Sequence, residues 1–270
     1  MDSHELELKT GQRFDFGANW QMFLAELSDP DIAMASAALL DSLEVSSLTG
    51  ITFLDVGSGS GLSSLAAFRA GARVVSFDFD PRSVLCTEEL RARSGATVTE
   101  WRVLRGSILD SQFVASLGEF DVVYSWGVLH HTGAMWQALD QAISRVAVSG
   151  QLFIALYNDQ GWASRYWQLV KKTYNRSSSH SFAMIAVHAP YFLAMRMGGN
   201  ILNLINGRVR GRRGMKFWRD VIDWLGGYPF EVADLHDVVR YVEAKGFRLQ
   251  NMNAVGWRNG CNEWVFRRTK

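Results

Sequence analysis

The segment Ile51–Asp80, ITFLDVGSGSGLSSLAAFRAGARVVSFDFD, constrains the fold more than any other part of the chain. Ile51–Val56 is a short apolar run rich in β-branched and aromatic residues, which is typical of a buried parallel strand. Three glycines end this strand, at Gly57, Gly59 and Gly61. Apolar residues then recur at helical spacing, and a second strand, Arg73–Phe77, leads to Asp78. The pattern predicts a strand, turn, helix and strand of an α/β sheet.

A glycine turn of this kind is suited to bind a nucleotide-like ligand. Glycine lets the backbone approach the ligand, and the N-terminus of the next helix offers unpaired N–H groups. An acid about 20 residues later can bind the two hydroxyls of a ribose, and Asp78 has this position. The nicotinamide fingerprint places its third glycine where this chain has Leu62, so we do not expect a pyrophosphate site.

These residues resemble class I S-adenosylmethionine-dependent methyltransferases. The segment Asp55–Gly61, DVGSGSG, is similar to their first motif, Asp78 matches their ribose-binding acid, and Phe120–Thr132, FDVVYSWGVLHHT, resembles their fourth-strand motif. The resemblance covers about Thr49–Asn158 and is weaker on both sides. It implies S-adenosylmethionine as cofactor and a Rossmann-like sheet of seven strands, mostly parallel with an antiparallel last strand. Helices would cover both faces, with a helical insertion after the fifth strand.

Four segments are expected along the chain. Residues 1–48 form an N-terminal helical lid, and residues 49–158 form the S-adenosylmethionine-binding core. Residues 159–230 form a helical cap for the acceptor, and residues 231–270 add a helix and a β-hairpin that completes the sheet. Within them we expect a helix over Ala134–Val148, a fifth strand over Gln151–Leu156 and a helix over Glu231–Lys245.

The cofactor contacts are assigned by the resemblance. Asp55 would meet the amino-acid end of the cofactor, whereas its structural alternative is a carboxylate that stabilises the loop. Ser107 stands where many relatives have an acid beside the adenine, and Trp126 packs against either the adenine or the core. The complete expected set is Asp55, Gly57, Ser58, Gly59, Gly61, Asp78, Phe79, Ser107, Ile108 and Trp126.

The catalytic candidates follow the fourth and fifth strands, because ligands bind at the carboxyl ends of strands in open α/β sheets. His130 and His131 offer neutral imidazole as a base near pH 7, and adjacent side chains point in different directions, so we favour His130 and expect the other to pack. Tyr157 would orient the acceptor. The expected substrate contacts are Asn19, Trp20, Asn158, Arg165 and Tyr228, and Glu231 and Asn262 are further candidates by position alone.

Composition narrows the class of partner. The formal net charge of +1 argues against a protein built to grip nucleic acid. Two distant cysteines and the lack of a secretory pattern favour a reduced, cytoplasmic compartment. Arg196 and a glycine pair interrupt the apolar stretch Ser181–Ile205, so we expect no membrane span, with peripheral lipid contact as an alternative. The arginine run at residues 208–213 is a solvated loop or an anion site.

The expected function is methyl transfer from S-adenosylmethionine to a small-molecule acceptor at oxygen, by a monomer or a homodimer. No closed set of metal ligands is evident. The alternatives are an N-methyltransferase, an RNA methyltransferase that uses the arginine run, a nicotinamide-dependent oxidoreductase, and a protein that binds S-adenosylmethionine without turnover.

Overall fold

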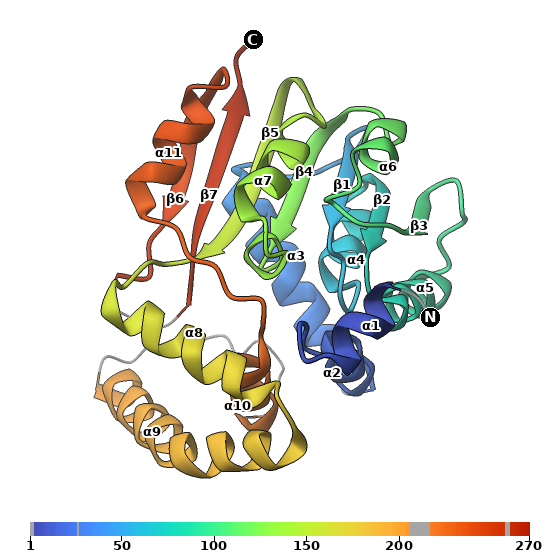
Figure 1. Ribbon diagram of the computed structural model, residues 1–270. Coiled ribbons are helices and arrows are strands. Elements are labelled where there is room, and N and C mark those ends of the chain that lie inside the picture. The colour runs from blue at the N-terminus through green and yellow to red at the C-terminus, as the bar shows by residue number, and fades with distance from the viewer. Residues whose placement is uncertain (1–2, 26, 206–216, 257–259) are drawn as a thin grey trace.

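The computed structural model describes residues 3–25, 27–205, 217–256 and 260–270. Seven strands form one sheet in the order β3-β2-β1-β4-β5-β7-β6 (Figure 1). The pairs among the first five are parallel, whereas β7 runs antiparallel to both β5 and β6. The expected methyltransferase-like sheet is therefore confirmed. The strands are β1 Thr52–Val56, β2 Arg73–Asp78, β3 Trp101–Arg105, β4 Phe120–Trp126, β5 Val146–Tyr157, β6 Phe247–Asn253 and β7 Cys261–Arg268.

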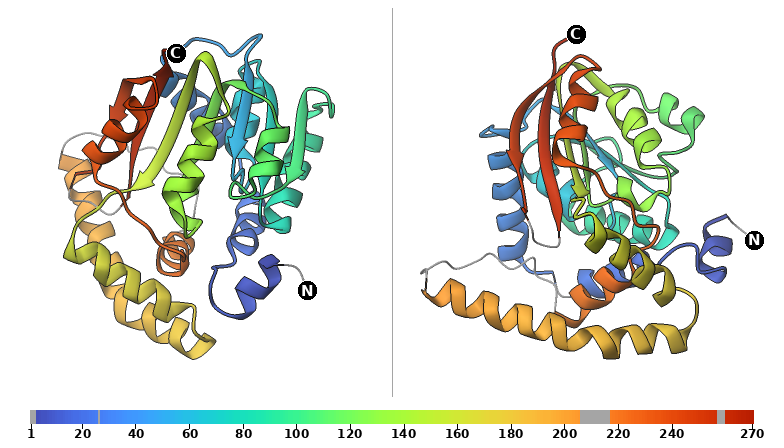
Figure 2. Two further views of the ribbon diagram at one scale, coloured as in Figure 1. Left: turned by 45° about the horizontal axis from the view of Figure 1, so that its top comes forward. Right: turned by 60° about the vertical axis from the view of Figure 1, so that its left-hand side comes forward.

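Helices cover both faces of the sheet and one of its ends (Figures 1 and 2). One face is covered by α3 (Asp29–Leu43), α4 (Leu62–Arg69) and α5 (Pro81–Ser94). The other is covered by α6 (Ser111–Ser116), α7 (Met135–Ile143) and α11 (Leu235–Glu243). At the carboxyl ends of the parallel strands lie α1 (Ser3–Lys9), α2 (Phe16–Leu24), α8 (Trp162–Tyr174), α9 (Ser178–Ile205) and α10 (Phe217–Gly226).

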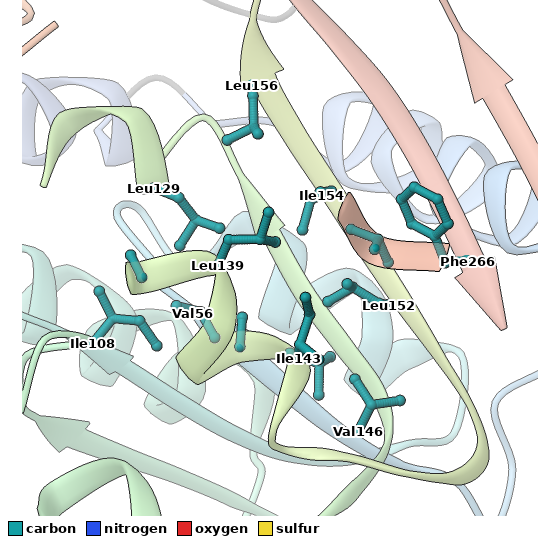
Figure 3. Packing of buried hydrophobic residues seen from close by; sticks show 14 of the residues in the cluster. Val56, Ile108, Leu129, Leu139, Ile143, Val146, Leu152, Ile154, Leu156 and Phe266 are labelled. Atoms are coloured by element: carbon teal, nitrogen blue, oxygen red, sulfur yellow. The ribbon is translucent and has the colours of Figure 1, made fainter. Parts of the chain in front are cut away.

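The core lies on both sides of the sheet because the central strands alternate between two apolar clusters. In β5, Leu152 and Ile154 face α7, whereas Phe153 faces the opposite cluster. Figure 3 shows Leu139 and Ile143 of α7 packed against the first pair. Each such side chain contributes about 1.5–3 kcal/mol when fully buried. Burial on both faces explains why the strands read as continuous apolar runs.

The boundary between α7 and β5 differs from the sequence prediction. The helix ends at Ile143 rather than Val148, and β5 begins at Val146 rather than Gln151. Ser149 has a φ of 64°, in the left-handed region, and the pairing of β4 with β5 shifts register after Phe120. An irregular strand therefore includes Ser149 and Gly150, the two residues between the predicted helix and the predicted strand.

The helix expected from Glu231 begins only at Leu235. Ala233 is held by the end of β5, because its N–H donates to the carbonyl of Tyr157 and its carbonyl accepts from Asp159. Asp234 then caps α11 by accepting from the N–H groups two and three residues on. A single bridge between Ala233 and Asn158, just beyond the end of β5, thus holds the chain before α11. Residues 208–213, the arginine run, lie outside the described residues.

Candidate functional site

A cavity of about 1040 Å³ lies at the carboxyl ends of β1, β2 and β4. Its walls come from the glycine turn after β1, the end of β2, the loop after β3, the end of β4 and the helix α2. Most expected site residues line it: Trp20, Asp55, Gly57, Ser58, Gly59, Asp78, Phe79, Ser107, Ile108, Trp126, His131 and Tyr157. The same cavity is therefore lined by residues expected to bind the cofactor and by residues expected to contact the acceptor.

The glycine turn is shaped by close contacts that only glycine permits. A Cβ on Gly57, whose φ is 77°, would lie 2.3 Å from a methyl carbon of Val128. A Cβ on Gly59 would lie 3.0 Å from the indole nitrogen of Trp20. The carboxylate of Asp78 accepts hydrogen bonds from the Gly59 N–H and the Asp80 N–H, both at 2.9 Å. The acid at the end of β2 is thus fixed against the turn after β1.

Asp55 lies beneath the turn in a buried polar network. Its carboxylate accepts from the Ser64 hydroxyl at 2.5 Å, and Ser64 is 2.6 Å from the Ser76 hydroxyl. Burial is the main cause that raises the pKa of Asp55 to about 7, with a smaller contribution from the nearby charge of Asp78. Burial likewise raises the pKa of Asp78 to about 6. A positively charged ligand would favour the ionised form of both acids.

The N-terminal helices close one side of the cavity. The Gly17 N–H donates to Asp80 at 2.8 Å, and the Arg82 guanidinium donates to Asp15 at 2.6 Å. Arg13 donates to the carbonyl of His131 at 3.1 Å. These bonds tie α2 and the loop before it to the ends of β2 and β4.

The two histidines occupy a 3₁₀ turn, Leu129–His131, directly after β4. His131 lines the cavity, and its Nδ1 lies 2.6 Å from the carbonyl of Pro229. A carbonyl only accepts, so Nδ1 carries the proton and Nε2 carries the lone pair. Burial is the main cause that lowers the pKa of His131 to about 3, helped by the charges of Lys171 and Arg13. The ring is neutral near pH 7.

His130, the histidine favoured from the sequence, does not line the cavity. It is fully buried, its Nδ1 accepts from the Tyr157 N–H at 3.3 Å, and its ring lies 3.9 Å from the Tyr157 ring. Burial holds its pKa well below the ordinary value. Of the two histidines, only His131 lines the cavity. His131 therefore replaces His130 as the candidate for contact with the acceptor.

The ring of Tyr157 separates the cavity from a buried lysine. The ammonium of Lys171, on α8, lies 4.4 Å from the ring centroid of Trp224 and 4.8 Å from that of Phe230. It donates to the carbonyl of Trp224. Tyr157 and Trp224 both line the cavity, so this cation–π cluster joins the cavity wall to α8 and α10.

Several expected residues lie elsewhere. Gly61 is the N-cap of α4 and packs against Thr87. The amide of Asn158 bonds to the Gly256 carbonyl at 2.7 Å and to Asn262 at 3.0 Å, which closes a strand-end turn. Glu231 accepts from the Met135 N–H, at the start of α7. Outside the cavity lining are also Asn19, which is buried in α2, Arg165, which is exposed on α8, and Tyr228.

Sequence reasoning missed several charged residues of the cavity wall, among them Glu263 and Arg13. Glu263, on β7, accepts from the indole N–H of Trp126 at 2.7 Å and from the Asn253 amide at 3.1 Å. In the sequence, the signal that could have indicated Glu263 is its carboxylate beside the apolar residues of the strand Cys261–Arg268. Arg13 lies in the polar N-terminal stretch, where no pattern distinguished it. Among the described residues no group of three or more His, Cys, Asp or Glu is placed to hold a metal.

Residues 54–152 match the family described as "Methyltransferase domain". Ribosomal protein L11 methyltransferase of Aliivibrio salmonicida is 31% identical over 100 residues, which cover 33% of this chain and 34% of that protein. Ubiquinone biosynthesis O-methyltransferase of Methylobacterium sp. is 30% identical over 119 residues, covering 44% and 45%. The chain spans about a third of the length of the first of these relatives and less than half of the second.

The fold matches solved methyltransferases over nearly the whole chain. Magnesium protoporphyrin IX methyltransferase from Synechocystis PCC 6803, with bound SAH, superposes with a TM-score of 0.54 at 15% identity and covers 93% of both chains. N-methyltransferase NodS from Bradyrhizobium japonicum gives 0.51 at 14% identity, covering 90% of this chain and 99% of that one. Residues 54–152 thus match a methyltransferase domain, and the sheet around the cavity has the fold of solved methyltransferases, one of them determined with bound SAH.

Proposed function

We propose that this chain methylates a small-molecule acceptor at oxygen, using S-adenosylmethionine in the cavity described above. The observation that carries the proposal is that one cavity contains both the Asp55 to Asp78 cofactor motif and the neutral imidazole of His131. A volume of about 1040 Å³ suits two small ligands, because pockets for a single ligand measure about 300–1000 Å³.

The cofactor end of the cavity is assigned to the strands β1 to β3. Asp78 would bind the ribose hydroxyls, with Phe79 and Ile108 beside the adenine. Asp55 would face the amino-acid end, and Trp20 would cover the glycine turn. S-adenosylmethionine supplies a methyl group on a positively charged sulfur, which an oxygen nucleophile can displace. Buried carboxylates on the same wall stabilise that positive charge in the ground state.

His131 would position the acceptor rather than remove its proton beforehand. A base whose pKa is about 3 abstracts protons poorly near pH 7, but its Nε2 lone pair can accept a hydrogen bond from a hydroxyl. That bond would aim the oxygen at the methyl group, and alignment alone can be worth about 7–11 kcal/mol. As the new C–O bond forms, the hydroxyl proton becomes strongly acidic, and it would pass to the Nε2 lone pair of His131 and from there to solvent. Tyr157 and Trp126 would form the aromatic sides of the acceptor region.

Three alternatives are kept. The curated relatives include a methyltransferase named for ribosomal protein L11 as well as one named as an O-methyltransferase, so a protein or RNA acceptor is the first. An amine acceptor is the second, and the carboxylate of Glu263 in the cavity wall is what favours it. Binding of the cofactor without turnover is the third. The small-molecule proposal rests on the size and aromatic lining of the cavity.

The test begins with the protein and methyl-labelled S-adenosylmethionine, incubated with small-molecule, protein and RNA fractions of a cell extract. We expect label in the small-molecule fraction, as a methyl ether. His131→Gln should keep cofactor affinity and lose transfer by about 100-fold or more, whereas His180→Gln, at an exposed position on α9, should change neither. Label in protein, in RNA or on nitrogen selects an alternative. Cofactor binding with no labelled fraction favours binding without turnover.

A further inference from the structure

The segment from residue 160 to residue 219 has an unusual charge. It contains eleven Lys and Arg and no Asp or Glu, whereas the other 210 residues contain 17 Lys and Arg against 27 Asp and Glu. The near-neutral net charge of the chain therefore conceals a strongly cationic segment. This segment includes α8 and α9, which lie beyond the carboxyl end of the sheet (Figures 1 and 2).

One face of α8 alternates apolar and cationic side chains. Trp162, Arg165, Leu169 and Lys172 follow one another at steps of three or four residues, so they share a helix face. Trp162 is 81% exposed and Leu169 62% exposed, and both cations are exposed as well. The opposite side of α8 is buried, because Trp167, Val170 and Tyr174 pack in the core of the cap.

The outer face of α9 adds further apolar surface. Phe182 is 75% exposed and Val187 66% exposed, whereas Met184, Ile185 and Phe192 on the inner face pack against α8 and α10. Figure 2 shows α9 running along the base of the molecule, away from the sheet. Large exposed apolar side chains on two helices that pack together mark a candidate interaction surface.

We propose that the cap patch, formed by Trp162, Arg165, Leu169, Lys172, Phe182 and Val187, binds the surface of an anionic lipid bilayer. Large apolar side chains insert into the interface, while Arg and Lys reach lipid phosphates along their own apolar stems. The acid-free segment supplies the attraction to a negative surface. Charge complementarity thus favours an anionic bilayer as the partner. The proposal does not depend on which acceptor is methylated.

Two other occupants fit the patch less well. A second copy in a two-fold contact would bring Arg165 and Lys172 against the same cations of its partner, with no acid in the segment to neutralise them. Nucleic acid would use the cations and Trp162, but Leu169 and Val187 have no aromatic face on which a base can stack. A lipid surface can accommodate the aliphatic, the aromatic and the cationic side chains of the cap patch.

The test is co-sedimentation of the whole chain with phosphatidylcholine vesicles, with and without phosphatidylglycerol, at low and high salt. We expect binding only to the anionic vesicles, weakened by salt. Trp162→Ser/Phe182→Ser and Arg165→Gln/Lys172→Gln should each lower the partition coefficient by about tenfold or more. The controls Leu85→Ser/Val148→Ser and Arg73→Gln/Arg102→Gln change residues of the same kinds that are exposed elsewhere, and they should bind as the unmodified chain does.

Circular dichroism of each variant separates loss of binding from loss of folding. Equal binding to neutral and anionic vesicles, or equal losses in the control variants, would overturn the proposal. So would retention on RNA without vesicle binding, or a patch-dependent dimer in light scattering. None of these measurements uses cofactor or acceptor, so their outcome is separate from that of the methyl-transfer test.

Discussion

Asp78 holds the N–H of Gly59 at 2.9 Å, so the last residue of β2 and the turn after β1 share a hydrogen bond across neighbouring strands. The same carboxylate accepts from Asp80. A carboxylate fixed by two backbone donors has its direction set before any ligand arrives, which lowers the entropic cost of binding. Its remaining lone pairs are the ones that would meet a ribose.

Replacement of Asp78 tests this arrangement. Asp78→Ala should raise the Kd for S-adenosylmethionine by about 10-fold to 100-fold, because a hydrogen bond to a charged group contributes about 1.5–3 kcal/mol. Isothermal titration calorimetry measures the change. Asp110→Asn alters the acid that caps α6 and lies outside the cavity lining, so its Kd should match that of the unmodified chain. Equal affinity in Asp78→Ala would remove this residue from the cofactor site.

The affinity for S-adenosylmethionine should rise with pH. Burial raises the pKa of Asp55 to about 7 and that of Asp78 to about 6, so the unliganded site is partly protonated in weak acid. A positively charged ligand favours the ionised acids, and its binding must then release protons. Between about pH 8 and about pH 5.5 the Kd should increase by about tenfold or more.

Calorimetry in buffers of different ionisation enthalpy counts the released protons directly. Asp55→Asn should remove most of the pH dependence, whereas Asp159→Asn, at an exposed turn, should preserve it. A Kd that stays constant over this range would show that neither acid changes its charge on binding.

The indole of Trp20 should contribute to cofactor binding. It lies over Gly59 and lines the cavity from the N-terminal side. Trp20→Ala should raise the Kd by about tenfold, because an aromatic contact on a ligand is worth about 1 kcal/mol or more. Trp162→Ala makes the same change at a position on α8 that is outside the lining and should leave the Kd unaltered. Equal Kd values for both variants would mean that α2 is not a lid.

His131 should make the chain less stable in acid. Its folded-state pKa of about 3 lies below the ordinary 6.5, so between these values the unfolded chain binds a proton that the folded chain does not. The free energy of unfolding therefore decreases as the pH falls below 6.5, by about 1.4 kcal/mol per pH unit for this group. Asp55 and Asp78 act with the opposite sign, since their stabilising effect is present at low pH and is lost as the pH rises through about 6 to 7.

The contribution of His131 is isolated by difference. Urea unfolding of the unmodified chain and of His131→Gln at about pH 7.5 and about pH 5 should show about 2 kcal/mol less acid sensitivity in the variant. His180→Gln serves as the exposed control and should show none of this change. Identical pH profiles for all three proteins would contradict a buried, neutral His131.

The sequence predicted the sheet well because local patterns determine it, and most residues expected at the cofactor end line the cavity. The continuous apolar run of β1 and the glycine turn are short-range features, and Asp78 follows them at a fixed interval. The acceptor end was predicted less well, since its walls come from distant parts of the chain. The choice between His130 and His131 depends on the carbonyl of Pro229, 98 residues away, and no local pattern encodes that contact.

The boundary errors have similar causes. Glu231 and the two residues after it favour a helix by composition. However, the Glu231 N–H donates to the carbonyl of His130 and Ala233 pairs with the end of β5, and such tertiary contacts override propensity. Arg165 and Tyr228 were substrate candidates by their position in the sequence alone, but Arg165 is exposed to solvent on α8 and Tyr228 lies outside the cavity lining.

The position of β7 between β5 and β6 affects how the chain is made. During synthesis β6 leaves the ribosome before β7, but its neighbour in the sheet is β7, so it has no edge to join until Cys261–Arg268 has emerged. Until then β5 is an open edge of unpaired N–H and carbonyl groups, which invites pairing with another chain. A ribosome that stalls shortly before Cys261 would therefore release a fragment prone to aggregate, with the wall that carries Glu263 still missing.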